Sequence, residues 1–276
     1  MFRKTSGAII CPSCGRLTTA DADACFVCGR RRPGMWGFAG PLRTLFRASS
    51  FTTLTMIACV ALYVASLVFD PVGALRPRGP FDLFSPTSRA LDMLGMTGAF
   101  AWAQGRWWTL LTAIYLHGSL LHILFNVLWI RQLGPAVEEL YGPARMVLIF
   151  TFSGVAGFVI SNAMGVPFTV GASGSIFGLL GAMVAFGHRR GGAFGSMVLR
   201  QYGQWALILF VFGLLPGTSI NNWAHGGGFV GGIAAGLALS LSDGRDETPV
   251  ERLAAVGIVA LTVLAFGLAL WTAFVV

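Results

Sequence analysis

Seven long apolar runs, separated by short polar links, constrain this chain more than any other feature. They lie at about residues 51–69, 110–130, 146–164, 173–186, 202–215, 223–241 and 253–276. A helix that crosses a bilayer needs roughly 20 such residues, and the shorter fourth and fifth runs need neighbouring protein around their ends. Only 11% of the residues are charged, against about 25% in soluble domains. The pattern predicts an all-α, polytopic membrane protein.

The basic residues predict how this helical region, residues 51–276, is oriented. Eight Lys and Arg residues precede the first run, and seven spans with a cytoplasmic N-terminus put fifteen of the nineteen on the cytoplasmic side. Cytoplasmic flanks of membrane proteins carry such an excess. We therefore expect a multi-pass integral protein of a bacterial plasma membrane, with its C-terminus extracytoplasmic. The same clustering accounts for the net charge of +8, so no nucleic-acid partner is expected.

Residues 1–33 form a separate polar module built on two Cys-x-x-Cys pairs. Cys11 and Cys14 make one pair, Cys25 and Cys28 the other, and each is followed by Gly-Arg. Four thiolates at this spacing suit a tetrahedral structural zinc ion, and so short a segment would need the metal to fold. Two disulfides are the alternative, which the reducing cytosol disfavours. We predict a zinc-ribbon-like cytosolic module that could bind a cytosolic partner, followed by a basic linker over residues 34–50.

Four polar side chains at the starts of apolar runs indicate chemistry inside the membrane. His117 and His122 lie in the second run, Ser173 opens the fourth, and His225 lies at the start of the sixth. These three runs all begin on the extracytoplasmic side in the predicted topology, so the four residues share one depth. Polar and ionisable groups are costly inside a bilayer and usually functional there. The pattern predicts a single site.

Ser173 and His225 are the candidate nucleophile and base of this site. Gly174 follows the serine, and glycines recur every four residues after Gly228 on the face of His225, so the two helices can approach closely. A neutral imidazole within hydrogen-bond reach makes a serine nucleophilic. All eleven acidic residues lie outside the apolar runs, which favours a Ser-His dyad, although an acid from the loop at 72–106 remains an alternative third member.

His122 and Asn126 are the candidate donors to an oxyanion. Their i, i+4 spacing places both on one helical face. The backbone N–H of Ser173, at the start of a helix, would add a third donor. Together these groups suit acyl transfer at a serine.

The ordered motifs resemble the rhomboid family of intramembrane serine proteases. They are His-Gly-Ser-Leu-Leu-His-Ile-Leu-Phe-Asn at 117–126, Gly-Ala-Ser-Gly at 171–174, and Ala-His-Gly-Gly-Gly-Phe-Val-Gly-Gly at 224–232. The resemblance covers about residues 107–236. It implies a six-helix core, with a seventh C-terminal transmembrane helix as in part of the family. It also implies cofactor-free cleavage of transmembrane protein substrates within the lipid bilayer.

The resemblance assigns the same roles to Ser173, His225, His122 and Asn126. It places Phe177 where an aromatic ring packs on the catalytic histidine and orients it in place of an acid. The remaining supporting positions are His117, which would brace the outer loop, Gly171 and Gly174. One departure is Thr109, because the family often has Arg after Trp at the end of the outer loop.

Two other classes of function are weaker alternatives. A non-catalytic relative that binds membrane proteins would typically lack the serine or the histidine, and both are present here. A transporter or channel would need buried acids or lysines for ion coupling, or an inverted repeat, and none is apparent in the sequence.

Overall fold

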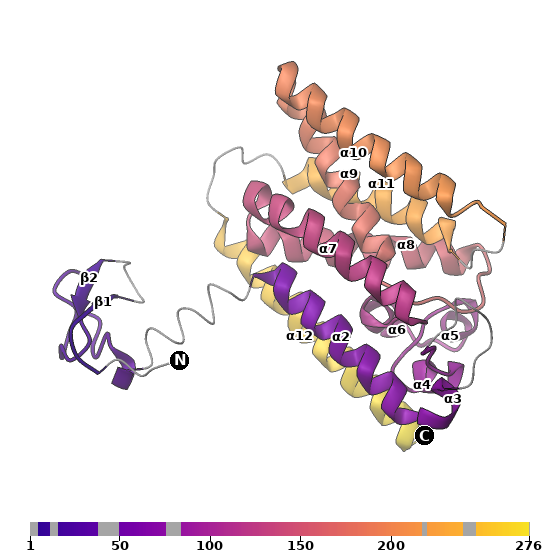
Figure 1. The fold of residues 1–276 in the computed structure, drawn as a ribbon, viewed down its shortest axis with the longest axis horizontal. Coiled ribbons are helices and arrows are strands. Elements are labelled where there is room, and N and C mark those ends of the chain that lie inside the picture. The colour runs from indigo at the N-terminus through magenta and orange to yellow at the C-terminus, as the bar shows by residue number, and fades with distance from the viewer. Residues whose placement is uncertain are drawn as a thin grey trace. The chain divides into compact units, whose positions relative to one another are not determined.

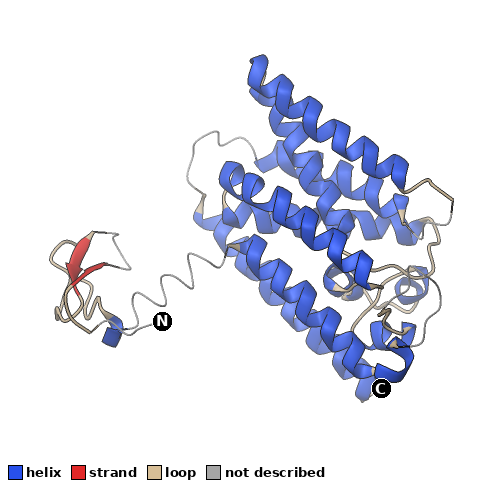
Figure 2. Cartoon of the chain, viewed as in Figure 1, coloured by secondary structure: helices blue, strands red, loops and turns tan. Residues whose placement is uncertain are grey.

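A computed structural model describes residues 5–11, 16–37, 50–75, 84–216, 220–239 and 247–275. Cys14 therefore lies outside the described residues. The chain divides into two compact units, Met1–Thr53 and Leu54–Val276. In Figure 2 the strands all belong to the first unit, and the second is built of helices.

The small unit contains two strands and two similar cysteine turns. Strand β1 (Ala8–Ile10) pairs antiparallel with β2 (Leu17–Thr19), and a short helix, η1 (Met35–Gly37), follows. The N–H of Cys11 donates to the carbonyl of Arg16, and the N–H of Cys25 donates to that of Arg30, both at 2.8 Å. The two halves of the sequence repeat therefore share the same backbone hydrogen bond.

The larger unit is a bundle of long helices (Figure 1). Those helices are α2 (Phe51–Phe69), α7 (Leu120–Tyr141), α8 (Pro143–Ala163), α9 (Ser173–Arg190), α10 (Gly192–Phe212), α11 (Asn222–Leu239) and α12 (Pro249–Phe274). Among the described residues α2, α7, α8 and α12 are long and apolar enough to cross a membrane. These helices fit the all-α, polytopic membrane class; seven crossings remain a prediction.

Two predicted spans had the wrong bounds. The second begins at Leu120, because the Ser119 hydroxyl accepts a hydrogen bond from the N–H of His122 at 3.2 Å and caps α7. The apolar stretch before it forms the short helices α6 (Thr109–Thr112) and η2 (Ala113–Tyr115) instead. The fifth, α10, starts ten residues earlier than predicted and is 21 residues long, so it is not a short span.

The described residues between α2 and α7 (70–75 and 84–119) are folded. They contain α3 (Pro71–Ala74), α4 (Ser88–Met93) and α5 (Ala99–Ala103). Arg106 pairs with Asp92 at 2.8 Å, and the Thr112 hydroxyl donates to the carbonyl of Gly95 at 2.6 Å. Leu91, Leu94, Met96 and Leu116 form their apolar core.

Helix α9 is the central helix, because nearly every side chain from Gly174 to Gly187 is buried. Its glycines meet those of α11 at backbone distance. A Cβ added to Gly228 would overlap the carbonyl oxygen of Gly174, and one added to Gly232 would overlap that of Gly178. The two helices therefore pack along a face of small residues, as the sequence predicted.

An ion pair joins the start of α12 to the start of α8. The Arg145 guanidinium is bidentate to Glu251, at 2.8 and 3.0 Å, and its side chain is 4% exposed. Thr248 and Glu251 form a capping box at the start of α12. Because a buried arginine without its carboxylate is costly, this pair fixes where the last helix begins against the bundle.

Candidate active site

The structure brings the N-terminal ends of α7, α9 and α11 together. His225, in the first turn of α11, stacks on Phe177 of α9 with ring centroids 4.2 Å apart and planes 19° apart. A Cβ added to Gly171, just before α9, would lie 2.6 Å from Nε2 of His122 in α7. The three helix starts that carry the predicted polar residues are therefore neighbours.

Ser173 is the first residue of α9 and is half-buried. Two residues earlier Gly171 has φ +125°, a conformation that favours glycine, and its N–H donates to the carbonyl of Ala113 at 2.9 Å. This anchors the loop that delivers the serine. The N–H groups of the first turn of a helix have no acceptor within the helix. Those at the start of α9, beside Ser173, therefore give this end of the helix a partial positive charge.

His225 is 6% exposed, and separate contacts hold its ring and its backbone. Phe177 covers one face of the ring, and the backbone N–H of His225 donates to the carbonyl of Asn221 at 3.1 Å. In the described part of the chain Nδ1 of His225 has no hydrogen-bond partner, and no hydrogen bond joins its ring to the Ser173 hydroxyl. Catalytic hydrogen bonds are often long before substrate binds.

The outer loop offers His225 no carboxylate among its described residues. Asp92 is bound to Arg106 at 2.8 Å, and its side chain is 53% exposed. Asp82 lies outside the described residues. Among the described residues, then, no carboxylate of this loop bonds to Nδ1 of His225, and the dyad stays a prediction.

His122 is oriented by the residues that precede α7. Its Nδ1 accepts a hydrogen bond from the N–H of Gly118 at 3.3 Å, so Nε2 carries the proton when the ring is neutral. That Nε2 is the atom that faces Gly171. His117 is fully buried, its Nδ1 lies 3.2 Å from the carbonyl of Tyr115, and its ring packs edge-on against His122 at 5.1 Å. His117 thus packs against the neighbouring histidine; that it also braces the outer loop stays a prediction.

Asn126 lies one turn after His122 and is 4% exposed. Its Nδ2 donates to the carbonyl of His122 at 2.7 Å, which leaves the second N–H of the amide for another acceptor. Oδ1 has no partner among the described residues. The shared face that the i, i+4 spacing predicted is present.

Asn221 holds the base and the serine loop in one network, and the sequence reasoning missed it. Its Oδ1 accepts from the N–H of Ala224 at 3.1 Å and caps α11. Its Nδ2 donates to the Ser161 hydroxyl at 2.6 Å and to the Thr169 hydroxyl at 3.0 Å. Thr169 lies four residues before Ser173, so one amide links the helix of His225 to the loop that precedes Ser173. An asparagine at a helix start was the available signal.

Thr109, which departs from the family pattern, is part of the same hydrogen-bond network. Its hydroxyl lies 3.1 Å from that of Thr97, which also accepts from Nδ2 of Asn162 at 3.2 Å. The backbone of Thr97 pairs with Thr169 in a β-bridge. Thr109 therefore supports the outer loop from inside, where it is 1% exposed.

Asn221→Ala should lower turnover about tenfold, because it removes a cap and two buried hydrogen bonds that contribute about 1 kcal/mol each. Asn221→Ser restores the cap but is too short to reach Ser161 and Thr169. It should regain thermal stability without regaining kcat, and KM should change little in both variants. Cleavage rates in proteoliposomes beside thermal unfolding separate the two effects. A wild-type kcat in Asn221→Ser would reduce Asn221 to a cap.

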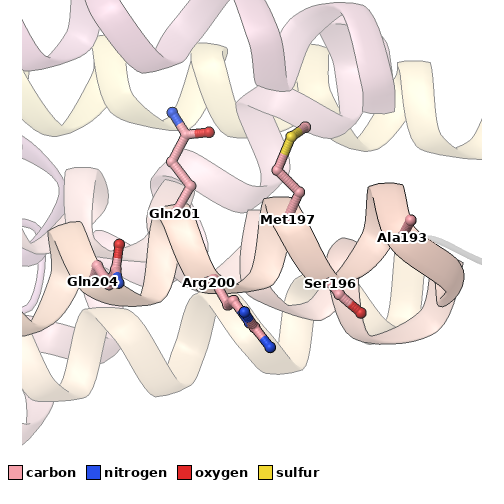
Figure 3. Close-up of a pocket in the computed structure, with 6 residues that line it drawn as sticks. All are labelled: Ala193, Ser196, Met197, Arg200, Gln201 and Gln204. Carbon is pink, nitrogen blue, oxygen red and sulfur yellow. The ribbon is translucent and has the colours of Figure 1, made fainter.

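A surface hollow of about 470 Å³ lies on α10, away from these residues. Figure 3 shows that its lining comes from one helix. The residues are Ala193, Ser196, Met197, Arg200, Gln201 and Gln204. None of them is a predicted site residue.

Three of the four predicted zinc ligands cluster in the small unit. The Sγ atoms of Cys11, Cys25 and Cys28 all lie within 4.8 Å of one another, and those of Cys11 and Cys28 are 3.7 Å apart. Zn–S bonds of about 2.3 Å in a tetrahedron put sulfurs about 3.8 Å apart, so the cluster fits the metal. N–H groups of Cys28 and then Val27 hydrogen-bond the thiol of Cys25 and lower its pKa to about 6. The fourth predicted ligand, Cys14, is outside the described residues.

Comparison with known proteins supports one family. The model of the rhomboid domain matches residues 104–242. The rhomboid protease GluP of Bacillus subtilis is 40% identical over 144 residues, half of this chain and 27% of GluP. RHOMBOID-like protein 5 of Arabidopsis thaliana is 31% identical over 203 residues, 69% of this chain and 63% of that protein. The rhomboid protease GlpG of Salmonella choleraesuis is 31% identical over 200 residues, 71% of this chain and 64% of GlpG.

The matches leave part of each relative uncovered. The chain spans between about a quarter and two thirds of the length of these curated relatives. All of the predicted catalytic positions, from His122 to His225, fall inside the matched rhomboid domain.

Proposed function

The chain belongs to the rhomboid family, and from this membership we propose that it is an intramembrane serine protease with Ser173 as nucleophile and His225 as base. The observation that carries the proposal is the stacking of His225 on Phe177 at 4.2 Å, at the start of two helices packed at backbone distance. This packing holds the imidazole near the N-terminal end of α9, whose first residue is Ser173.

In the proposed reaction Oγ of Ser173 attacks the carbonyl carbon of a peptide bond, and its proton passes to His225. The tetrahedral intermediate collapses when His225 gives that proton to the leaving amine, and an acyl-enzyme remains. Water then attacks the acyl group with His225 again as base, which releases the second product and restores Ser173.

The oxyanion of each intermediate would lie between α7 and the start of α9. The candidate donors are Nε2 of His122, the second amide N–H of Asn126 and the backbone N–H of Ser173. Such donors lower the barrier because they are already oriented in a site that excludes bulk water. The hydrogen bond from Gly118 to His122 supports this role by fixing the proton on Nε2.

Phe177 would do what a third acidic residue does in a triad. Its ring restricts rotation of His225, so the imidazole keeps the orientation that proton transfer needs. The unpartnered Nδ1 of His225 in the described chain supports a dyad.

The proposed substrates are transmembrane segments of other membrane proteins, cleaved in or beside the bilayer. A peptide bond inside a helix is shielded, so the segment must unwind locally, which small and helix-breaking residues favour. We further propose that the site faces the extracytoplasmic side of a bacterial plasma membrane, with the N-terminus cytoplasmic, because of the bias in basic residues.

The test is cleavage of a single-span substrate by the purified full chain in proteoliposomes, with and without a fluorophosphonate that acylates activated serines. Time-dependent cleavage that the fluorophosphonate blocks is expected. Substrate binding without cleavage and without probe labelling would favour the alternative, a non-catalytic binding protein.

For the N-terminal region we propose a structural zinc ion bound by Cys11, Cys14, Cys25 and Cys28 within a module of residues 1–33. A basic linker at 34–50 would join it to the protease domain at 51–276. The fit of the Sγ separations to a tetrahedral site supports the metal. Cys28 is exposed. The proposal also includes binding of a cytosolic partner by the module.

Purified protein should contain about one zinc per chain, and Cys25→Ser should lose it, because three-thiolate sites bind the ion less tightly than four. The control is Cys59→Ser, since Cys59 is buried in α2 and should leave the zinc content unchanged. Metal analysis by mass spectrometry measures both. Full zinc content in Cys25→Ser would remove the cysteine site from the proposal.

A further inference from the structure

The tip of the second cysteine turn exposes two apolar side chains. Phe26 is 79% exposed and Val27 is 63% exposed. The turn is closed by its backbone, because the N–H of Gly29 donates to the carbonyl of Cys25 at 2.9 Å. The equivalent positions of the first turn are Pro12 and Ser13. A turn of this kind therefore does not need apolar side chains at its tip.

Basic side chains directly follow the tip. Arg30, Arg31 and Arg32 are exposed, and Arg31 pairs with Ala24 in a β-bridge on the other arm of the turn. The Arg32 guanidinium lies 5.2 Å from the ring of Trp36, which is itself 63% exposed. Residues 1–50 contain eight basic residues and two acidic ones. Apolar and aromatic side chains among arginines suit the interface of an anionic bilayer, where each basic residue contributes about 1 kcal/mol.

The length of the linker keeps the module near a membrane. Residues 38–50 separate η1 from α2, one of the helices long and apolar enough to span a bilayer. Even fully extended, this segment reaches only about 45 Å at about 3.5 Å per residue. Such a tether gives an effective concentration of about millimolar, so contacts that are weak in themselves suffice.

We propose that this tip surface, Phe26 and Val27 with Arg30 to Arg32, docks on the anionic phospholipid headgroups of the membrane that α2 crosses. The two apolar side chains enter the headgroup region, and the arginines contact lipid phosphates. A protein partner fits the tip less well, since specific protein interfaces bury about 1,000 Å² or more in total and this apolar tip is two side chains. The proposal does not depend on the protease reaction.

Hydrogen exchange of the full-length, zinc-loaded protein in nanodiscs tests this docking. We expect amides near residues 26–28 to exchange at least about fivefold more slowly when phosphatidylglycerol is present than in phosphatidylcholine alone. The difference should shrink at 1 M salt, where the Debye length is about 3 Å. Equal exchange rates in the two lipids would overturn the proposal. If the amides were protected equally in both, that protection would come from a contact with the rest of the chain.

Matched variants assign the effect to the tip. Changing Phe26→Ser together with Val27→Ser removes both apolar side chains from the tip of the second turn, and it should abolish the lipid-dependent protection at unchanged zinc content. Arg30→Gln with Arg31→Gln should reduce it. Leu17→Ser, at an apolar residue of β2 that is 70% exposed, is the control and should retain it. Protection that survives the double serine change would refute the assignment.

Discussion

Ser173→Ala and His225→Ala should each abolish proteolysis and labelling by a fluorophosphonate. The hydroxyl forms the covalent bond, and the imidazole of His225 is held against α9 by its stacking on Phe177. In serine proteases that work this way, the loss of either group costs about 10⁴-fold or more, and the losses do not add. The double variant should therefore be no slower than either single one.

Both measurements use protein purified in the same detergent. Ser173→Ala should keep the thermal stability of the wild type, since Ser173 is half-buried and the change removes a single oxygen. Ser175→Ala is the matched control, because Ser175 lies on the same helix and is fully buried with no hydrogen-bond partner for its Oγ in the described chain. It should label and cleave as the wild type does. Probe labelling that persists in Ser173→Ala would refute the assignment of the nucleophile.

Gly232→Ala should nearly eliminate activity through packing alone. Its Cβ would overlap the carbonyl oxygen of Gly178, and a carbonyl in the middle of a helix cannot move aside as a flexible side chain can. Helices α9 and α11 must then separate, at a cost of about 1–3 kcal/mol. Because a displacement of about 1 Å between reacting groups can cost about a hundredfold in rate, kcat should fall more than stability does.

Gly257→Ala is the control for this change. Gly257 lies in α12, and a Cβ added there meets no atom within 4 Å. That variant should keep full activity and be equal or slightly higher in stability, since alanine favours helix over glycine by about 1 kcal/mol. Thermal unfolding and cleavage rates measured together decide the matter. Wild-type activity in Gly232→Ala would show that the two helices need not touch at Gly178.

The local patterns of the chain carried much of its architecture. The apolar runs predicted the long helices, and the glycine spacing on α11 predicted a close approach, which the overlap of an added Cβ at Gly228 with Gly174 bears out. Both follow from short-range rules, because helical periodicity decides which residues share a face.

The same rules failed where a long-range contact competes with an apolar run. Residues 110–115 are as apolar as a membrane span, but α7 begins only after Ser119 caps it. The carbonyl of Ala113 accepts the N–H of Gly171, so this stretch serves as the anchor of the serine loop. Hydropathy alone cannot show that difference.

Ser173, His122 and His225 could be selected from the sequence, because a serine and histidines at helix starts within apolar runs are rare and costly. Their mutual arrangement required the tertiary structure. Which face of His225 Phe177 covers, and how Asn221 links α11 to Thr169, depend on contacts between residues about 50 positions apart. No local pattern encodes such contacts, since each exists only once the helices have packed.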